Sequence, residues 1–108
     1  MNEIDRLYNW LIENKDFYGW RVEKIDHHPY NTFAPWYQVI VYDKEDERLW
    51  DAVWHSFSYG FNRGLLEIMG CDIVNEEEDG DCVVGWLTAD DVIERVIKVY
   101  GEPKMKEE

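Results

Sequence analysis

The chain has 108 residues, 45% of them hydrophobic and 16% aromatic, and it carries a formal net charge of −13. Its length fits one folded domain, and its apolar content excludes the class of disordered acidic chains. The negative charge disfavours direct binding to nucleic acid or to an anionic membrane surface.

Most of the negative charge lies in the second half of the chain. Residues 43–94 carry fifteen acids and three bases, whereas residues 1–42 carry six acids and four bases, and residues 95–108 carry three acids and four bases. A compact acidic surface attracts basic surfaces, and basic surfaces in a cell are mostly built to hold nucleic-acid phosphates. The charge distribution therefore favours a decoy that occupies such a surface on another protein.

The sequence shows no pattern that directs a protein to a membrane. Its first fifteen residues mix charged and apolar side chains, unlike a secretory signal, and its apolar runs are shorter than the ~18–20 residues that span a bilayer. We therefore expect a cytoplasmic protein. In a reducing cytoplasm Cys71 and Cys82 are predicted to be free thiols.

The first half of the chain predicts one helix and two strands. Apolar side chains recur at helical spacing over residues 3–14, with Asn2 as the cap, and the helix is expected to break between Asp16 and Gly19. Residues 20–26 and 36–42 are rich in strand-forming side chains. We expect these two strands to pair as an antiparallel hairpin with a long loop.

The second half predicts mainly helices. A helix is expected from Asp43 or Lys44 to about Ser58, followed by a short helix over residues 62–69 that ends at Gly70. Residues 71–87 fit either short strands or an ordered loop. The last helix is expected to start after Thr88, with Asp91 in a capping box, and to stop at Gly101 and Pro103.

This order of elements predicts an α+β fold. We expect a small antiparallel sheet of two or three strands, with three or four helices packed on one face. Residues 1–103 are predicted to form a single acidic domain, and residues 104–108 a frayed tail.

Two acidic segments are the candidate binding residues. On the expected second helix, Asp43, Glu47 and Asp51 are spaced by four and would share one face. A run of acids near residue 78 would extend this surface if it folds beside the helix. The full candidate set for binding a basic partner is Asp43, Glu45, Asp46, Glu47, Asp51, Glu76, Glu77, Glu78, Asp79 and Asp81.

The residues do not predict a metal site, a cofactor or catalysis. Residues 75–86 resemble a calcium loop in part, but Trp86 stands where that loop needs a bidentate Glu. The three histidines and two cysteines lack the spacings of a zinc site, and nothing near Cys82 would activate it as a nucleophile. We expect no cofactor and no enzyme activity.

Aromatic side chains support two alternatives. In the first alternative, aromatic rings at the surface stack on the base of a bound nucleotide beside an arginine. In the second, these rings are buried in the symmetric interface of a self-assembling homo-oligomer. The rings expected in the core are Trp50, Trp54, Phe57, Tyr59 and Phe61, and those expected at the surface are Tyr30, Phe33, Trp36, Tyr37 and Tyr42. The arginines considered for a nucleotide site are Arg21, Arg48 and Arg63.

Three segments carry a resemblance to a known group. They are Ser58-Tyr59-Gly60, residues 64–70 (GLLEIMG) and residues 84–93 (VGWLTADDVI). Together they resemble small acidic accessory proteins of Firmicute phages and prophages. The order of elements and the charge also resemble some type II anti-CRISPR proteins, which bind the basic nucleic-acid groove of an RNA-guided nuclease. The resemblance implies a non-enzymatic inhibitor of a host defence nuclease in the bacterial cytosol.

Overall fold

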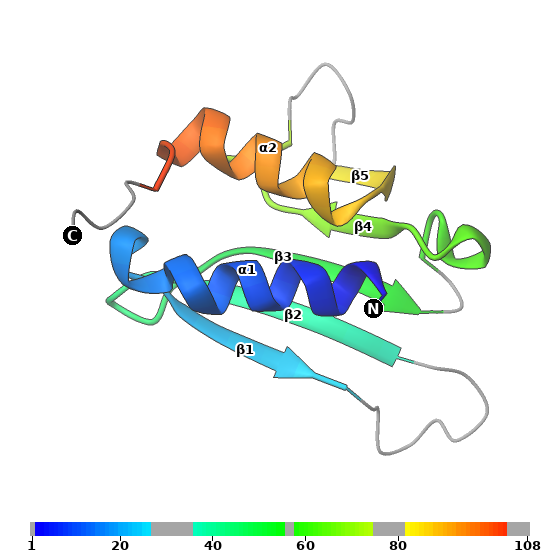
Figure 1. Ribbon diagram of the computed structural model, residues 1–108, viewed down its shortest axis with the longest axis horizontal. Helices are drawn as coiled ribbons and strands as arrows, with labels where there is room; N and C mark the ends of the chain where they lie inside the picture. Colours follow the sequence, from blue (N-terminus) through cyan, green and yellow to red (C-terminus); the bar gives the residue numbers. More distant parts are fainter. Residues whose placement is uncertain (1, 27–35, 56–57, 75–81, 104–108) are drawn as a thin grey trace.

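The computed structural model describes residues 2–26, 36–55, 58–74 and 82–103 (Figure 1). This part of the chain forms a five-stranded antiparallel sheet in the order β1-β2-β3-β4-β5, with two α-helices on one face. The helices are α1, Glu3–Tyr18, and α2, Ala89–Tyr100. The strands are β1, Arg21–Ile25; β2, Trp36–Tyr42; β3, Arg48–His55; β4, Leu66–Met69; and β5, Val83–Leu87.

The first three elements are present as predicted, but α1 continues four residues beyond the predicted range of 3–14, through Asp16 and Phe17, where a break was expected. The side chain of Asn2 accepts a hydrogen bond from the backbone N–H of Asp5 at 2.9 Å and caps α1. The helix runs to Tyr18 and ends at Gly19, whose φ of 73° lies in the left-handed region that glycine adopts readily. Strands β1 and β2 pair antiparallel, as expected.

The helix predicted from residue 43 to 58 is wrong. Residues 43–47 form a tight turn, in which the Asp43 carboxylate accepts hydrogen bonds from the N–H groups of Glu45 and Glu47 at 2.8 and 3.0 Å. Strand β3 follows and pairs with β2 along its length. The aromatic residues of this segment fit helical spacing, but Trp50 and Ala52 also fit the two-residue period of a strand. Pairing with β2 decided between the two.

The helix predicted over residues 62–69 is also wrong. A short 3-10 helix, η1 (Phe61–Arg63), lies between Gly60 and Gly64, which have φ values of 95° and 71°. Strand β4 then buries Leu66 and Ile68, whereas Glu67 and Met69 alternate with them and lie on the other face of the sheet. The predicted fold class is therefore corrected to five strands and two α-helices in the described residues, within an α+β fold.

The last helix confirms its predicted signals. Thr88 and Asp91 form a capping box, in which each side chain accepts a hydrogen bond from the other residue's backbone N–H. Gly101 is the C-cap. Strand β5 covers the last part of residues 71–87, for which the sequence fitted either short strands or an ordered loop.

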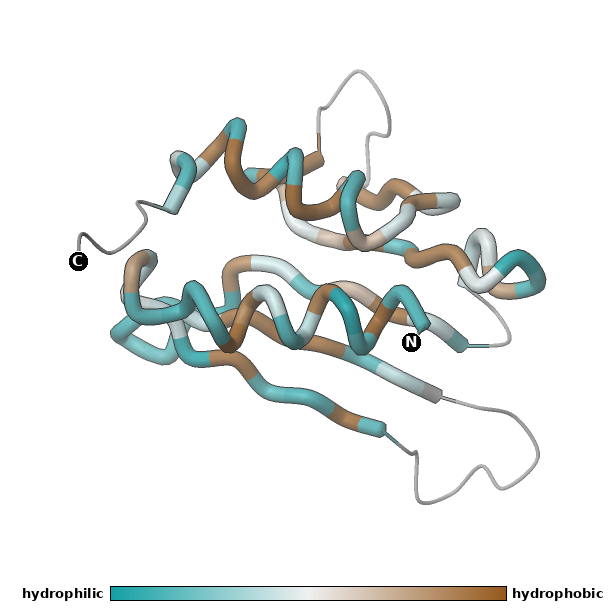
Figure 2. The backbone as a smooth tube through the Cα atoms, viewed as in Figure 1, coloured by the Kyte–Doolittle hydropathy of each residue, from teal (hydrophilic) through white to brown (hydrophobic). Residues whose placement is uncertain are grey.

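Both helices pack on one face of the sheet and run in the same direction (Figure 1). At their starts, the Glu3 carboxylate accepts a hydrogen bond from the N–H of Ala89 at 2.7 Å. At their ends, the Tyr18 hydroxyl donates to the carbonyl of Gly101 at 2.6 Å. Hydrophobic residues line the central strands and one side of each helix, and hydrophilic residues lie on the turn between β2 and β3 (Figure 2). The core therefore lies between the helices and the sheet.

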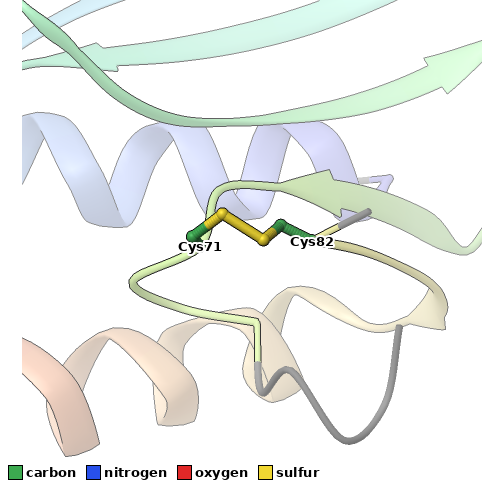
Figure 3. The surroundings of a disulfide bond; sticks show 2 residues. All are labelled: Cys71 and Cys82. Carbon is green, nitrogen blue, oxygen red and sulfur yellow. A yellow bond between two sulfur atoms is a disulfide. The ribbon is translucent and has the colours of Figure 1, made fainter. Parts of the chain in front are cut away.

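Cys71 and Cys82 form a disulfide, so the prediction of free thiols is wrong (Figure 3). The antiparallel pairing of β4 with β5 brings the ends of these strands together, and Gly70 donates a backbone hydrogen bond to Cys82. The two Cα atoms are 4.9 Å apart, within the usual range for a disulfide. The inference from the compartment could not anticipate a pairing that depends on strand register.

Candidate functional site: a groove beside α2

The acids of the β2–β3 turn do not form the helical face that was predicted. Asp43 uses its carboxylate to hold the turn. Asp46 accepts a hydrogen bond from the Arg21 guanidinium at 2.9 Å, so its charge is partly compensated. Glu45 and Glu47 are exposed. The turn therefore presents fewer uncompensated carboxylates than the sequence indicates.

Asp51 lies away from this turn, in the middle of β3. It points to the face of the sheet opposite the helices and is 5% exposed. Its Oδ2 atom accepts a hydrogen bond from Gln38 at 2.8 Å and pairs with Arg48 at 2.9 Å, whereas its Oδ1 atom is buried without a hydrogen-bond partner. Asp51 is a structural residue here, and it does not share a face with Asp43 and Glu47.

The second predicted acidic segment lies outside the described residues. It comprises Glu76, Glu77, Glu78, Asp79 and Asp81. The residues on either side are described, and the Cys71–Cys82 disulfide joins them. Thus the point at which this acidic segment leaves the fold is known.

A groove of about 690 Å³ lies between α2 and residues 72–74, beside the disulfide. Its volume falls within the range of about 300–1,000 Å³ typical of ligand sites. Buried apolar side chains, Ile73, Val74 and Leu87, lie along it. Its charged lining consists of the carboxylates Asp72, Asp91 and Glu94 and the cations Arg95 and Lys98.

Hydrogen bonds hold the walls of this groove in place. Arg95 donates to the carbonyl of Ile73 at 3.0 Å and so ties α2 to the segment that follows the disulfide. The Tyr100 hydroxyl donates to Asp72 at 3.1 Å. Burial of Tyr100, and secondarily the negative charge of Asp72, raise the pKa of the Tyr100 hydroxyl. The carboxylates of the groove are therefore presented from an ordered frame.

Sequence reasoning missed this groove. Asp91 was assigned only a capping role, and Glu94, which lies three residues further on, was not singled out. The sequence did contain a signal for this pair, because two acids three residues apart on a helix share one face, and the bounds of this helix were predicted well. Asp72 could not have been added, since its position against α2 depends on the disulfide and on Tyr100.

The aromatic predictions hold in part. Trp50 is buried in the core, and Trp54 stacks on Tyr37 with ring centroids 5.3 Å apart. Tyr37 and Tyr42 are only half-buried, and Arg21 stacks on Tyr42. Tyr59, expected in the core, is instead 59% exposed. Residues Tyr30, Phe33 and Phe57, and the side chain of Trp36, lie outside the described part of the structure.

The described residues hold no group of three or more histidine, cysteine, aspartate or glutamate side chains arranged to bind a metal. Among those same residues, no helix has the length and apolar character needed to cross a bilayer. No family model, curated protein or solved structure matches this chain.

Proposed function

We propose that this protein is a non-enzymatic inhibitor that binds a basic nucleic-acid-binding surface on a host defence nuclease, and that the groove beside α2 is its contact site. The proposal keeps the predicted decoy function and moves its centre away from the β2–β3 turn. The partner would be a nuclease of the RNA-guided type.

One observation supports this site above the other acidic segments. Asp72, Asp91 and Glu94 line a single groove, and the five acids between residues 76 and 81 belong to the loop that the adjacent disulfide closes. Within the closed loop, residues 72–81, there are six acids and no lysine or arginine. The three carboxylates of the groove outnumber its two cations, Arg95 and Lys98, and the closed loop adds only acids to them. The summed charge of groove and loop is negative, which attracts a basic surface.

The groove also offers more than charge. Its apolar residues can receive the aliphatic stems of lysine or arginine while the carboxylates meet the charged ends. Arg95 already donates to a backbone carbonyl, so it serves the frame of the groove. A segment rich in lysine or arginine is therefore the ligand chemistry that fits best.

Charge neutralisation tests the assignment. The double variant Asp91→Asn/Glu94→Gln keeps an amide oxygen at position 91 that can accept the capping hydrogen bond from the N–H of Thr88. It is compared with a control, Glu13→Gln/Asp16→Asn, which makes the same change in net charge on exposed positions of α1. Binding to purified RNA-guided nucleases is measured by surface plasmon resonance at two salt concentrations. The groove variant is expected to bind at least about tenfold more weakly, mostly through a slower association rate.

The control separates a local site from bulk charge. If both double variants lose affinity equally, the net charge of the protein matters and the groove does not. If the wild-type protein binds none of the nucleases at low salt, the proposed partner class is wrong.

A further inference from the structure

An exposed aromatic corner lies at the end of the molecule where α2 begins, outside the groove beside α2 (Figure 1). It consists of Tyr59, Arg63 and Trp86, contributed by the β3–β4 connection and by β5. Tyr59 and Trp86 are 59% and 57% exposed. The Arg63 guanidinium lies 6.0 Å from the centre of the Trp86 ring. These three residue types are the ones most enriched among protein-binding hot spots.

The backbone at Trp86 is unusual for a bulky residue. Its φ is 65°, in the left-handed region that favours glycine. The register between β4 and β5 shifts here, because Leu66 pairs with Leu87 whereas Ile68 pairs with Val84, so β5 holds one extra residue. This is a β-bulge, and a bulge of this type usually places glycine in the left-handed position. Here Trp86 occupies that left-handed position, and its side chain is exposed to solvent.

Two glycines bring the segments of this corner into direct contact. A Cβ atom on Gly85 would lie 2.2 Å from the Cβ of Tyr59, and one on Gly60 would lie 3.1 Å from the Cα of Trp86. The N–H of Trp86 donates to the carbonyl of Tyr59 at 3.4 Å, and the N–H of Tyr59 donates to Glu67 at 3.2 Å. The backbone beneath the exposed rings is therefore fixed in place.

Arg63 differs from other arginines of this acidic protein. Arg6, Arg21 and Arg48 each pair with a carboxylate. Arg63 forms no ion pair with any described carboxylate, and its one described charge-related contact is the ring of Trp86. Within residues 2–26, 36–55, 58–74 and 82–103, its guanidinium donors therefore meet no carboxylate, and such donors bind a carboxylate in a two-pronged geometry.

We propose that Tyr59, Arg63 and Trp86 form an anchor that inserts into an apolar pocket with a carboxylate at its rim on a partner protein. The carboxylate pairs with Arg63, and the pocket buries the two rings. A small ligand fits less well, because Tyr59 and Trp86 are each exposed over more than half of their surface. Nucleic acid fits less well because the chain carries a net charge of −13. This inference rests on the proposed function in taking the partner to be a protein.

If Trp86 contacts a partner and does not support the fold, its replacement should leave the thermal stability of the protein almost unchanged. Trp86→Asn and Trp86→Gly place residues that tolerate the left-handed region at position 86. Relief of backbone strain offsets the lost contacts, so the melting temperature is expected to shift by less than about 4 °C. A fall of more than about 4 °C in both variants would mean that Trp86 serves the fold, and would overturn the proposal.

Site-specific photo-crosslinking identifies what covers the corner. Tyr59→p-benzoylphenylalanine is compared with Phe17→p-benzoylphenylalanine, which replaces an exposed ring at the opposite end of α1. Both proteins are irradiated in Firmicute cells that carry an RNA-guided nuclease. The expected result is a protein adduct at position 59 alone, with a crosslinked peptide from an apolar pocket that contains an acidic residue.

The purified partner then tests the energetics. Trp86→Asn and Arg63→Glu are each expected to weaken its binding by about 30-fold or more, as for hot-spot residues, whereas Phe17→Ala leaves it unchanged. No adduct above the control, an adduct with nucleic acid, or an adduct with a second copy of this chain would overturn the proposal. If these variants weaken binding and the neutralised double variant of the groove does not, the anchor stands and the proposed role of the groove fails.

Discussion

Removal of the Cys71–Cys82 disulfide is expected to destabilise the protein by an amount that follows from the loop it closes. The two cysteines are 11 residues apart in sequence. In the chain-entropy treatment, closing a loop of this length removes enough freedom from the unfolded state to stabilise the fold by about 3 kcal/mol. For a domain of this size, with an unfolding entropy of about 2 cal/mol/K per residue, that corresponds to a fall in melting temperature of about 14 °C.

The assay is thermal unfolding followed by circular dichroism. The wild-type protein is measured with and without a dithiol reductant, and the variant Cys71→Ala/Cys82→Ala is measured without it. Reduced wild type and the double variant are expected to melt at the same temperature, both about 14 °C below the oxidised protein. The reductant should not change the melting temperature of the double variant, since it has no disulfide to lose.

A shift of less than about 4 °C would refute the entropic reasoning. It would mean that the segment between Cys71 and Cys82 is already restricted in the unfolded state, or that the closed loop is strained in the native state. A large shift would have a functional consequence, because the same disulfide holds the base of the acidic loop beside the groove.

Three further predictions concern single side chains. Gly85→Ala is expected to lower the free energy of unfolding, measured in urea, by about 3 kcal/mol, because the new Cβ would lie 2.2 Å from the Cβ of Tyr59. Gly64→Ala has no atom within 4 Å of its new Cβ and should lower it by about 1 kcal/mol, through its positive φ alone. Equal losses would contradict the close contact at Gly85. Asp51→Ala is expected to lower the free energy of unfolding by about 1–3 kcal/mol in the same assay, because Gln38 and Arg48 lose their acceptor. Asp90→Ala removes the exposed ion pair with Arg6 and should lower it by less than about 1 kcal/mol. The reverse order would show that Asp51 is dispensable for stability. The pKa of Tyr100 is raised in the fold from the ordinary value of 10.0, so its contribution to stability is complete below that pH and declines as the pH rises above it. Melting temperatures at pH 9 and pH 11 should therefore differ more for the wild type than for Tyr100→Phe, and an identical pH dependence would rule out this linkage.

Local signals in the sequence determined the parts of the fold that depend on near neighbours. The caps at Asn2 and Thr88, the stop at Gly19 and the run of strand-forming residues over 36–42 all act within a few residues, so both helices and the first hairpin were predicted correctly. The acidic character of the protein also followed directly from composition.

Tertiary structure decided the parts in which one pattern fits two structures. The apolar residues from Trp50 to Trp54 satisfy both helical and strand spacing, and only the hydrogen bonds to β2 selected the strand. The register of β4 against β5 joined Cys71 to Cys82, which no spacing rule predicts. The groove and the aromatic corner followed from those pairings, because each combines residues far apart in the sequence that meet only once the sheet is formed.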